Sequence, residues 1–159
     1  MAIAAMYLKI SGVTGESLID GHVGEIDLVS WDWGVQSARY AMSDGSPGTA
    51  SSFNAVNVVK RVDRATATLF QFCDQHKLVS SAKLTVSKAS GGSPLDYVTI
   101  DMTNLRIIKV DVRSEEAELT EHVTLSAETM TFNYTPQASG GAGASAPISY
   151  TAIHPASQS

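Results

Sequence analysis

The chain has 159 residues, of which 43% are hydrophobic and 17% are charged, so it is long and apolar enough for one folded domain with its own core. Eleven Lys and Arg residues against sixteen Asp and Glu residues give a net charge of −5. Duplex DNA and anionic membranes attract concentrated positive charge, which argues against nucleic acid or membrane as a main partner. The single cysteine, Cys73, excludes an internal disulfide and any metal centre built from cysteines.

The N-terminal residues Met1 to Ile10 carry no basic residue ahead of their apolar stretch, which Lys9 interrupts. A secretory signal needs a positively charged start and an unbroken apolar run, so we expect no signal peptide. No apolar run in the sequence approaches the ~20 residues that a membrane-spanning helix needs. We therefore expect a soluble chain that is made in the cytoplasm and does not insert into a membrane.

Apolar and polar residues alternate with a period of two along much of the chain, which predicts half-buried antiparallel strands. The apolar positions of this pattern are Met6, Leu8 and Ile10; Ala82, Leu84 and Val86; Val98, Ile100 and Met102; Ile108, Val110 and Val112; and Val123, Leu125 and Ala127. The pattern changes phase between Leu28 and Val29 and again between Ala127 and Met130. Each change moves apolar side chains across the sheet, so we expect a bulge or strong bend near each.

One segment, Thr66 to His76, predicts a helix, because Leu69, Phe72 and Cys73 recur at helical spacing and Asp63 or Thr66 can cap the N-terminus. We therefore predict a mainly β fold: a compact β-barrel of two antiparallel sheets with one short α-helix and a long extended loop. We interpret residues 1–159 as a single domain.

Two stretches fit neither periodicity. The stretch from Val35 to Asn54 is long for a loop in a compact domain. It is rich in Gly, Ala, Ser and Thr, yet it carries Val35, Tyr40, Met42 and Phe53, which a purely solvated loop has little reason to hold. We interpret it as an extended arm that docks onto another surface. The stretch from Pro136 to Pro147 is rich in Gly, Ala and Ser, which is typical of a flexible linker, and it leads to a short final strand over Ile148 to Ile153.

Candidate chemical groups are few, and each has a structural interpretation that we favour. The histidines, His22, His76, His122 and His154, do not have the spacing of a helical metal pair. Cys73 could be a nucleophile, but it fits the buried stripe of the predicted helix. The acidic run Glu115, Glu116, Glu118 and Glu121 could chelate a cation, but a solvated turn is the simpler interpretation. The basic cluster Lys60, Arg61 and Arg64 surrounds Asp63, which favours a salt-bridge patch at the helix entry over a nucleic-acid surface. We expect no enzyme activity, no metal and no cofactor.

Several blocks of the sequence carry a more specific signal. The N-terminal blocks are Lys9-Ile10-Ser11-Gly12-Val13-Thr14-Gly15-Glu16-Ser17, His22, Glu25-Ile26-Asp27-Leu28 and Ser30-Trp31-Asp32-Trp33-Gly34. The later blocks are Lys60 with Asp63, Ala82-Lys83-Leu84-Thr85 with Lys88-Ala89, and Leu119-Thr120-Glu121 with Val123-Thr124-Leu125 up to Tyr134 and Gln137. In this order and spacing they closely resemble the Hcp family, the haemolysin-coregulated proteins that form the inner tube of the bacterial type VI secretion system. The resemblance departs from the family at Asp32, where a small polar residue is usual, and in the last strand, which lacks the family's tryptophan.

The resemblance implies a tail-tube-like barrel that closes into a homo-hexameric ring. Rings of the family stack into a hollow tube that is tipped by a spike protein, assembled on a baseplate and driven out by a contractile sheath. The tube assembles in the cytoplasm, its subunits reach the extracellular space or a target cell, and effector proteins can travel in its lumen.

By the same resemblance Asp32 is expected to face the lumen. The arm from Val35 to Asn54 is expected to contact neighbouring subunits and the next ring. Its candidate interface residues are Val35, Arg39, Tyr40, Met42, Asp44 and Phe53.

Two alternatives stay open from the sequence. The chain could be a tube subunit of phage type, although the Gly-Glu-Ser and Trp-x-Trp-Gly blocks favour the secretion family. It could also be a soluble β-barrel enzyme or binding module, for which a deep pocket with shifted titratable groups in a monomer would be the signature.

Overall fold

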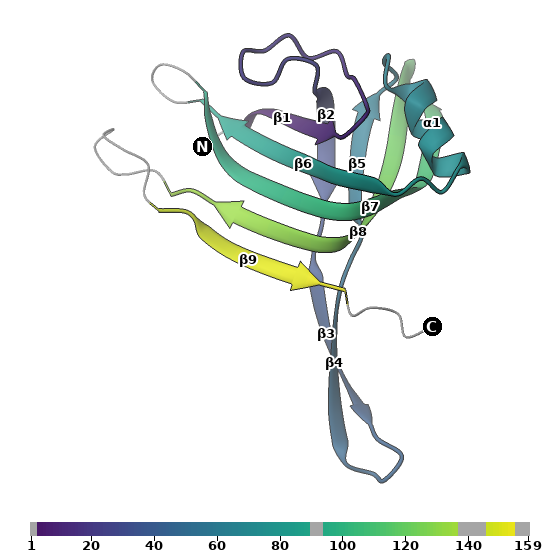
Figure 1. The fold of residues 1–159 in the computed structure, drawn as a ribbon, viewed down its shortest axis with the longest axis vertical. Coiled ribbons are helices and arrows are strands. Elements are labelled where there is room, and N and C mark those ends of the chain that lie inside the picture. The colour runs from purple at the N-terminus through teal and green to yellow at the C-terminus, as the bar shows by residue number, and fades with distance from the viewer. Residues whose placement is uncertain (1–2, 90–93, 137–145, 155–159) are drawn as a thin grey trace.

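The computed structural model describes residues 3–89, 94–136 and 146–154. Nine strands and one helix are seen in this part of the chain (Figure 1). The strands are β1 (Ile3–Ile10), β2 (Ile26–Asp32), β3 (Val35–Ala41), β4 (Pro47–Phe53), β5 (Val56–Arg61), β6 (Val79–Lys88), β7 (Leu95–Glu115), β8 (Glu118–Tyr134) and β9 (Ile148–Ile153), and the helix is α1 (Thr66–Asp74). No helix within these described ranges has both the length and the apolar character needed to span a bilayer.

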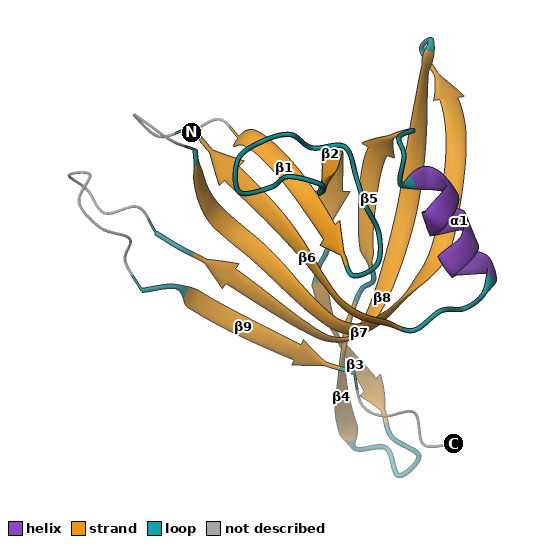
Figure 2. Cartoon of the chain, turned by 45° about the horizontal axis from the view of Figure 1, so that its top comes forward, coloured by secondary structure: helices purple, strands orange, loops and turns teal. Residues whose placement is uncertain are grey.

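Seven of the strands form one sheet in the order β5-β2-β1-β6-β7-β8-β9, with every neighbouring pair antiparallel. Strand β8 also pairs with β5, from Val56 opposite Leu125 to Arg61 opposite Thr120. This contact closes a barrel of six strands: β5, β2, β1, β6, β7 and β8. The second half of β8 pairs instead with β9, which lies outside the closed ring of strands (Figure 2). The predicted β-barrel with one short helix is therefore confirmed.

The barrel interior is filled mostly by the apolar residues that the alternation pattern selected. The prediction was wrong for the ladder Ile108, Val110 and Val112: Ile108 and Val112 are exposed, because the pairing of β7 with β8 shifts register between Ile107 and Lys109, and Ile107 is buried instead. Leu8, Leu84, Ile100, Leu125 and Met130 are fully buried there, each from a different strand or strand segment. Side chains of this size fill a small barrel completely, so the interior is a packed core and not a channel.

Both predicted phase changes coincide with irregular backbone. The pairing of β2 with β5 shifts register between Leu28 and Ser30. In the long strands β7 and β8, Met102 pairs with Met130 and Leu105 with Ala127, and all four side chains are buried although the members of each strand lie three residues apart. Asn104, between them, has a positive φ of 49°, which is tolerated by asparagine and bends the strand. The two strands thereby turn from one wall of the barrel into the other.

The predicted helix is confirmed but ends at Asp74, two residues earlier than expected. Leu69 and Phe72 are buried against the barrel, whereas Cys73 is only half-buried. His76 adopts a positive φ of 50°, and the amide of Lys77 donates to the carbonyl of Phe72 at 3.0 Å, which is how many helices end.

The stretch from Val35 to Asn54 was predicted to be an extended loop, and this prediction was wrong. The structure shows a β-hairpin. Strands β3 and β4 pair from Val35 opposite Phe53 to Ala41 opposite Pro47 and form a separate two-stranded sheet that projects from one end of the barrel (Figure 1). Every residue of β3 is exposed, so neither face of this ribbon carries the apolar alternation by which a strand is recognised. The predicted final strand is confirmed as β9, and most of the predicted linker between Pro136 and Pro147 lies outside the described residues.

Candidate functional site

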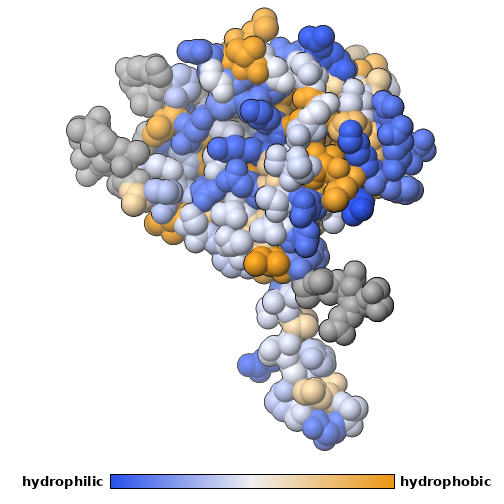
Figure 3. Space-filling model, in the orientation of Figure 1, coloured by the Kyte–Doolittle hydropathy of each residue, from blue (hydrophilic) through white to orange (hydrophobic). Residues whose placement is uncertain are grey.

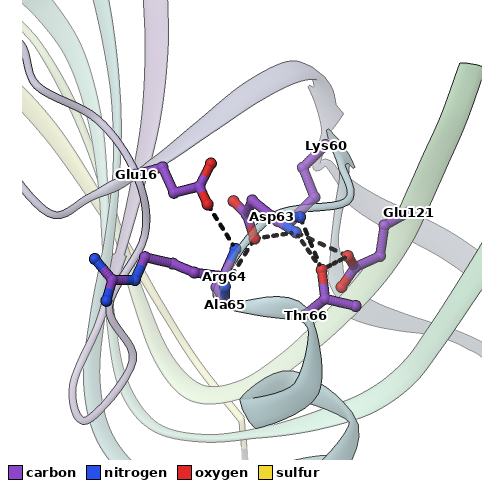
Figure 4. Close-up of polar contacts among 7 residues, drawn as sticks. All are labelled: Glu16, Lys60, Asp63, Arg64, Ala65, Thr66 and Glu121. Atoms are coloured by element: carbon purple, nitrogen blue, oxygen red, sulfur yellow. Dashed lines mark hydrogen bonds and ion pairs between the residues drawn. The ribbon is translucent and has the colours of Figure 1, made fainter.

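A buried ion-pair network joins the closing seam of the barrel to the start of the helix (Figure 4). The Lys60 ammonium lies 2.8 Å from a carboxylate oxygen of Asp63 and 2.8 Å from one of Glu121, and the side chains of Lys60 and Glu121 are both 0% exposed. The Thr66 hydroxyl donates to Glu121 at 2.7 Å. The predicted salt bridge at the helix entry is confirmed for Lys60 and Asp63. The interpretation of Glu121 as part of a solvated turn was wrong, because it pairs across β5 and β8 with Lys60.

The Gly-Glu-Ser block forms the entry of the β1–β2 loop, residues 11–25. A Cβ on Gly15 would lie 2.3 Å from the carbonyl oxygen of Glu25, so only glycine lets the two ends of the loop pass this closely. The amide of Gly15 donates to the carbonyl of Gly24 at 2.7 Å. Glu16 accepts a hydrogen bond from the amide of Arg64 at 3.1 Å, and Ser17 is buried. The block therefore ties the loop to itself and to the helix entry.

His22 pins the same loop to the outer surface of the barrel. Its ring stacks on Tyr7 of β1 with centroids 4.1 Å apart, its Nε2 lies 3.1 Å from a carboxylate oxygen of Asp96, and its Nδ1 pairs with Glu25. Burial, with smaller contributions from the carboxylates of Asp27, Asp96 and Glu25, raises the pKa of Tyr7. The loop is thus clamped by its polar side chains.

A polar wall covers the outer face of strands β2, β5, β8 and the second half of β7. Asp32 lies on it, exposed, and accepts a hydrogen bond from the Asn57 amide at 3.0 Å. Asn57 in turn accepts one from the Thr124 hydroxyl at 2.9 Å, and Thr124 lies opposite Lys109. The four residues form one row across four strands, because directly paired residues share a face. Trp31, one residue earlier, pairs with buried Val58 and faces the core.

Ion pairs between exposed side chains continue this wall. Lys109 lies 3.2 Å and Arg113 lies 3.6 Å from Asp111. The hydrogen bond from Lys109, helped by the charges of both cations, holds the pKa of Asp111 below its usual value. Both signs of charge alternate over the wall, so it is hydrophilic without being strongly acidic or basic.

The hairpin presents four of the predicted interface residues: Arg39, Tyr40, Met42 and Asp44 are all exposed on it. Tyr40 lies over Gly48 of the opposite strand, where a Cβ would come within 2.7 Å of its ring. At the tip Asp44 accepts hydrogen bonds from the Ser46 hydroxyl at 2.6 Å and the Ser46 amide at 2.9 Å, and these lower the pKa of Asp44. The tip therefore has a fixed shape.

At the base of the hairpin, the side chain of Phe53 packs against His154, just beyond β9, with ring centroids 4.0 Å apart and ring planes tilted by 43°. Val35 and Phe53 line a groove of about 370 Å³ together with Tyr150, Ile153 and His154. Ile148, Tyr150 and Ile153 of β9 are exposed. The structure thus brings Val35 and Phe53 to the hairpin base, the other four interface residues to its outer part, and Asp32 to the barrel wall. Sequence reasoning missed the β9 side of this groove because its contacts bridge segments about a hundred residues apart.

These surfaces occur on a fold with known relatives. The profile of the family described as "Type VI secretion system effector, Hcp" matches residues 7–134, which is more than half of the chain. The chain belongs to the Hcp family. It is 32% identical over 148 residues to protein Hcp1 of Pseudomonas aeruginosa, with 91% of each chain covered.

Solved structures of Hcp proteins agree with this assignment. A type VI secretion system effector from Yersinia pestis superposes with a TM-score of 0.74 at 28% identity, covering 94% of this chain and 99% of the other. Hcp1 from Salmonella typhimurium gives a TM-score of 0.73 at 27% identity, covering 96% and 95%. The matched range of the Hcp profile contains the loop, the hairpin, the helix and both partners of the buried network, and it ends where β8 ends, ahead of β9.

Proposed function

We propose that this Hcp chain is a structural subunit of the inner tube of a type VI secretion system, in which six copies form a ring and rings stack into a hollow tube. Its role is geometric: it supplies walls and edges for other copies and performs no catalysis. The observation that carries the proposal is the hairpin, a ribbon that projects into solvent and in which every residue of β3 is exposed within the part of the chain that the structure describes.

An isolated two-stranded hairpin is marginal in water, because it buries too little apolar surface to offset the cost of ordering its backbone. Here both β3 and β4 have one unpaired edge among the described residues, and Val35, Tyr40 and Met42 expose apolar surface along it. The exposed strand β9 offers a further edge at the hairpin base. Contact with neighbouring copies would satisfy these edges, and a repeated head-to-tail contact closes into a ring when its rotation allows.

The polar wall is suited to line the channel of such a ring. It is hydrophilic, extends across four strands and holds Asp32 in a hydrogen-bonded row. In a six-fold ring, six Asp32 carboxylates would face a shared lumen and repel acidic cargo, while the paired charges around them would leave the rest of the wall neutral.

Comparing cargo retention tests this arrangement. Tubes carrying Asp32→Lys should lose cationic effector proteins and retain acidic ones better, and Asp32→Ser should lie between Asp32→Lys and the native chain. Asn57→Ser serves as a control on the same row without a change of charge. Equal retention of cationic and acidic cargo by all of these chains would refute the lumen assignment of Asp32.

The ring itself is tested by native mass. Six chains of 16.8 kDa predict a particle of about 100 kDa in dilute solution. A monomer that persists at high protein concentration would refute the proposal.

As a tube subunit, the chain would assemble in the cytoplasm, contact the sheath, spike and baseplate, and leave the cell with the effectors that it accompanies.

A further inference from the structure

The β1–β2 loop exposes apolar side chains while it buries polar ones, which is the reverse of an ordinary surface loop. Leu18, Ile19 and Val23 have exposed fractions of 86%, 50% and 69%, whereas Ser17 and Glu25 are buried. We call Leu18, Ile19 and Val23 the loop crest. Figure 3 shows hydrophobic surface at the top of the molecule, over this loop. A cluster of this kind on one loop is typical of an interaction surface.

The crest is held rigidly by the backbone beneath it. The amide of His22 donates to the carbonyl of Ile19 at 2.8 Å, and the amide of Gly24 donates to the carbonyl of Ser17 at 2.8 Å. Gly21 and Gly24 adopt positive φ values of 84° and 79°, which allow these tight turns. Together with the stack of His22 on Tyr7, these bonds keep the apolar side chains from folding back onto the barrel. A preorganised surface loses little entropy when it binds a partner.

The hairpin tip lies at the opposite end of the molecule. Along the longest axis, the β1–β2 loop is at the top of Figure 1 and the β3–β4 hairpin at the bottom. The tip also exposes apolar surface, from Tyr40 and Met42, and its shape is fixed by the Asp44–Ser46 hydrogen bonds. Both surfaces also carry charge: the crest loop has exposed Asp20, and the hairpin has exposed Arg39 besides Asp44, whose carboxylate is hydrogen-bonded to Ser46. Neither Asp20 nor Arg39 makes an ion pair within the part of the chain that the structure describes.

We propose that the loop crest of one copy receives the hairpin tip of a second copy, with Leu18, Ile19 and Val23 packed against Tyr40 and Met42. Because the two surfaces differ and lie at opposite ends, the contact is head-to-tail and repeats along an axis without closing. The inference rests on the proposed tube and deepens it, since it assigns the axial contact between rings to named residues.

Disulfide trapping tests this contact directly. Two chains are prepared in a Cys73→Ser background, one with Val23→Cys and the other with Met42→Cys, and they are mixed under mild oxidation. A disulfide forms only when two Cα atoms come within about 4.4–6.8 Å, so the proposal predicts a covalent dimer between the two chains at several-fold higher yield than in a control mixture. The control pairs Met42→Cys with Ser80→Cys, an exposed position on β6.

A second substitution separates specific packing from random collision. Leu18→Asp added to the Val23→Cys chain should lower the disulfide yield several-fold, whereas Ile108→Asp, at an exposed position of β7, should leave it unchanged. A yield no higher than that of the Ser80 control, or one that Leu18→Asp does not lower, would overturn the inference. Native mass is measured on the same samples under reducing conditions: rings of about 100 kDa without the disulfide would refute only the crest contact, whereas monomers would refute the ring.

Discussion

Removing the Lys60 ammonium is the sharpest perturbation of the fold itself. Lys60→Met keeps the length and the apolar stem of the side chain but deletes the charge that lies 2.8 Å from both Asp63 and Glu121. Glu121 is fully buried and pairs with Lys60 across the β5–β8 seam, so its carboxylate would remain in the core with the Thr66 hydroxyl as its only partner among the described residues. We expect the barrel seam and the helix entry to weaken together.

The magnitude follows from the burial of the pair. Breaking a buried ion pair by removing one partner costs about 3–5 kcal/mol, because an uncompensated charge is left behind. An exposed pair contributes about 0–1 kcal/mol. The chain provides such a pair as a control, since Arg61 and Glu118 lie 3.7 Å apart with side chains 66% and 60% exposed. Arg61→Ala should therefore cost much less than Lys60→Met.

Denaturant unfolding at one fixed protein concentration measures these differences, because assembly shifts the apparent stability with concentration. The double variant Lys60→Met/Glu121→Met removes both buried charges and should recover most of the loss, to within roughly 1–2 kcal/mol of the native chain. If Lys60→Met cost no more than Arg61→Ala, or if the double variant were as unstable as the sum of its single variants, the assignment of the network as a coupled buried unit would be refuted.

Further predictions concern the loop and the polar wall. Gly15→Ala should cost about 1–3 kcal/mol of unfolding free energy, because its Cβ would overlap the Glu25 carbonyl, whereas Gly34→Ala, whose Cβ would meet only a side chain at 3.7 Å, should be near neutral in the same denaturation assay. Lys109→Ala should raise the pKa of Asp111 toward the ordinary 3.8, as read by NMR titration, and an unmoved pKa would contradict the assigned cause. Because the folded-state pKa of Asp111 is lowered, its stabilising contribution is present above pH 3.8 and is lost as the pH falls through the lower folded value, so the stability gap between the native chain and Asp111→Asn should shrink in acid.

Much of the barrel could be predicted from the sequence because most of its strands bury one face. Alternation identified most of the core residues but placed Ile108 and Val112 wrongly, because the sequence does not show the register shift after Ile107. The break in phase between Ala127 and Met130 located the bend that Asn104 makes in the partner strand. The hairpin could not be recognised in this way, since β3 is exposed on both faces and its Ala, Ser and Gln residues give no period of two. The pairing of β5 with β8, which closes the barrel, joins residues some sixty positions apart and has no local signal.

In the candidate site, too, contacts between residues close in sequence could be predicted, and contacts between distant segments could not. Lys60 and Asp63 are three residues apart, so their pairing could be predicted, whereas Glu121 seemed part of an exposed acidic run because its partner lies 61 residues away. Asp32 was expected from the family resemblance to face the lumen, whereas its bond to Asn57 depends on the register of β2 against β5, which no local pattern in the sequence reveals. The exposed loop crest was missed, because an apolar residue in a glycine-rich loop gives no indication of which way it points.

Electron microscopy of the purified chain tests the central claim most directly. If six copies enclose a channel with their walls, class averages will show annular particles with six-fold symmetry and an open centre, and Asp32→Cys labelled with a heavy-atom cluster will place extra density inside that opening. Compact particles without a central hole, or label density only on the outer rim, would contradict the account.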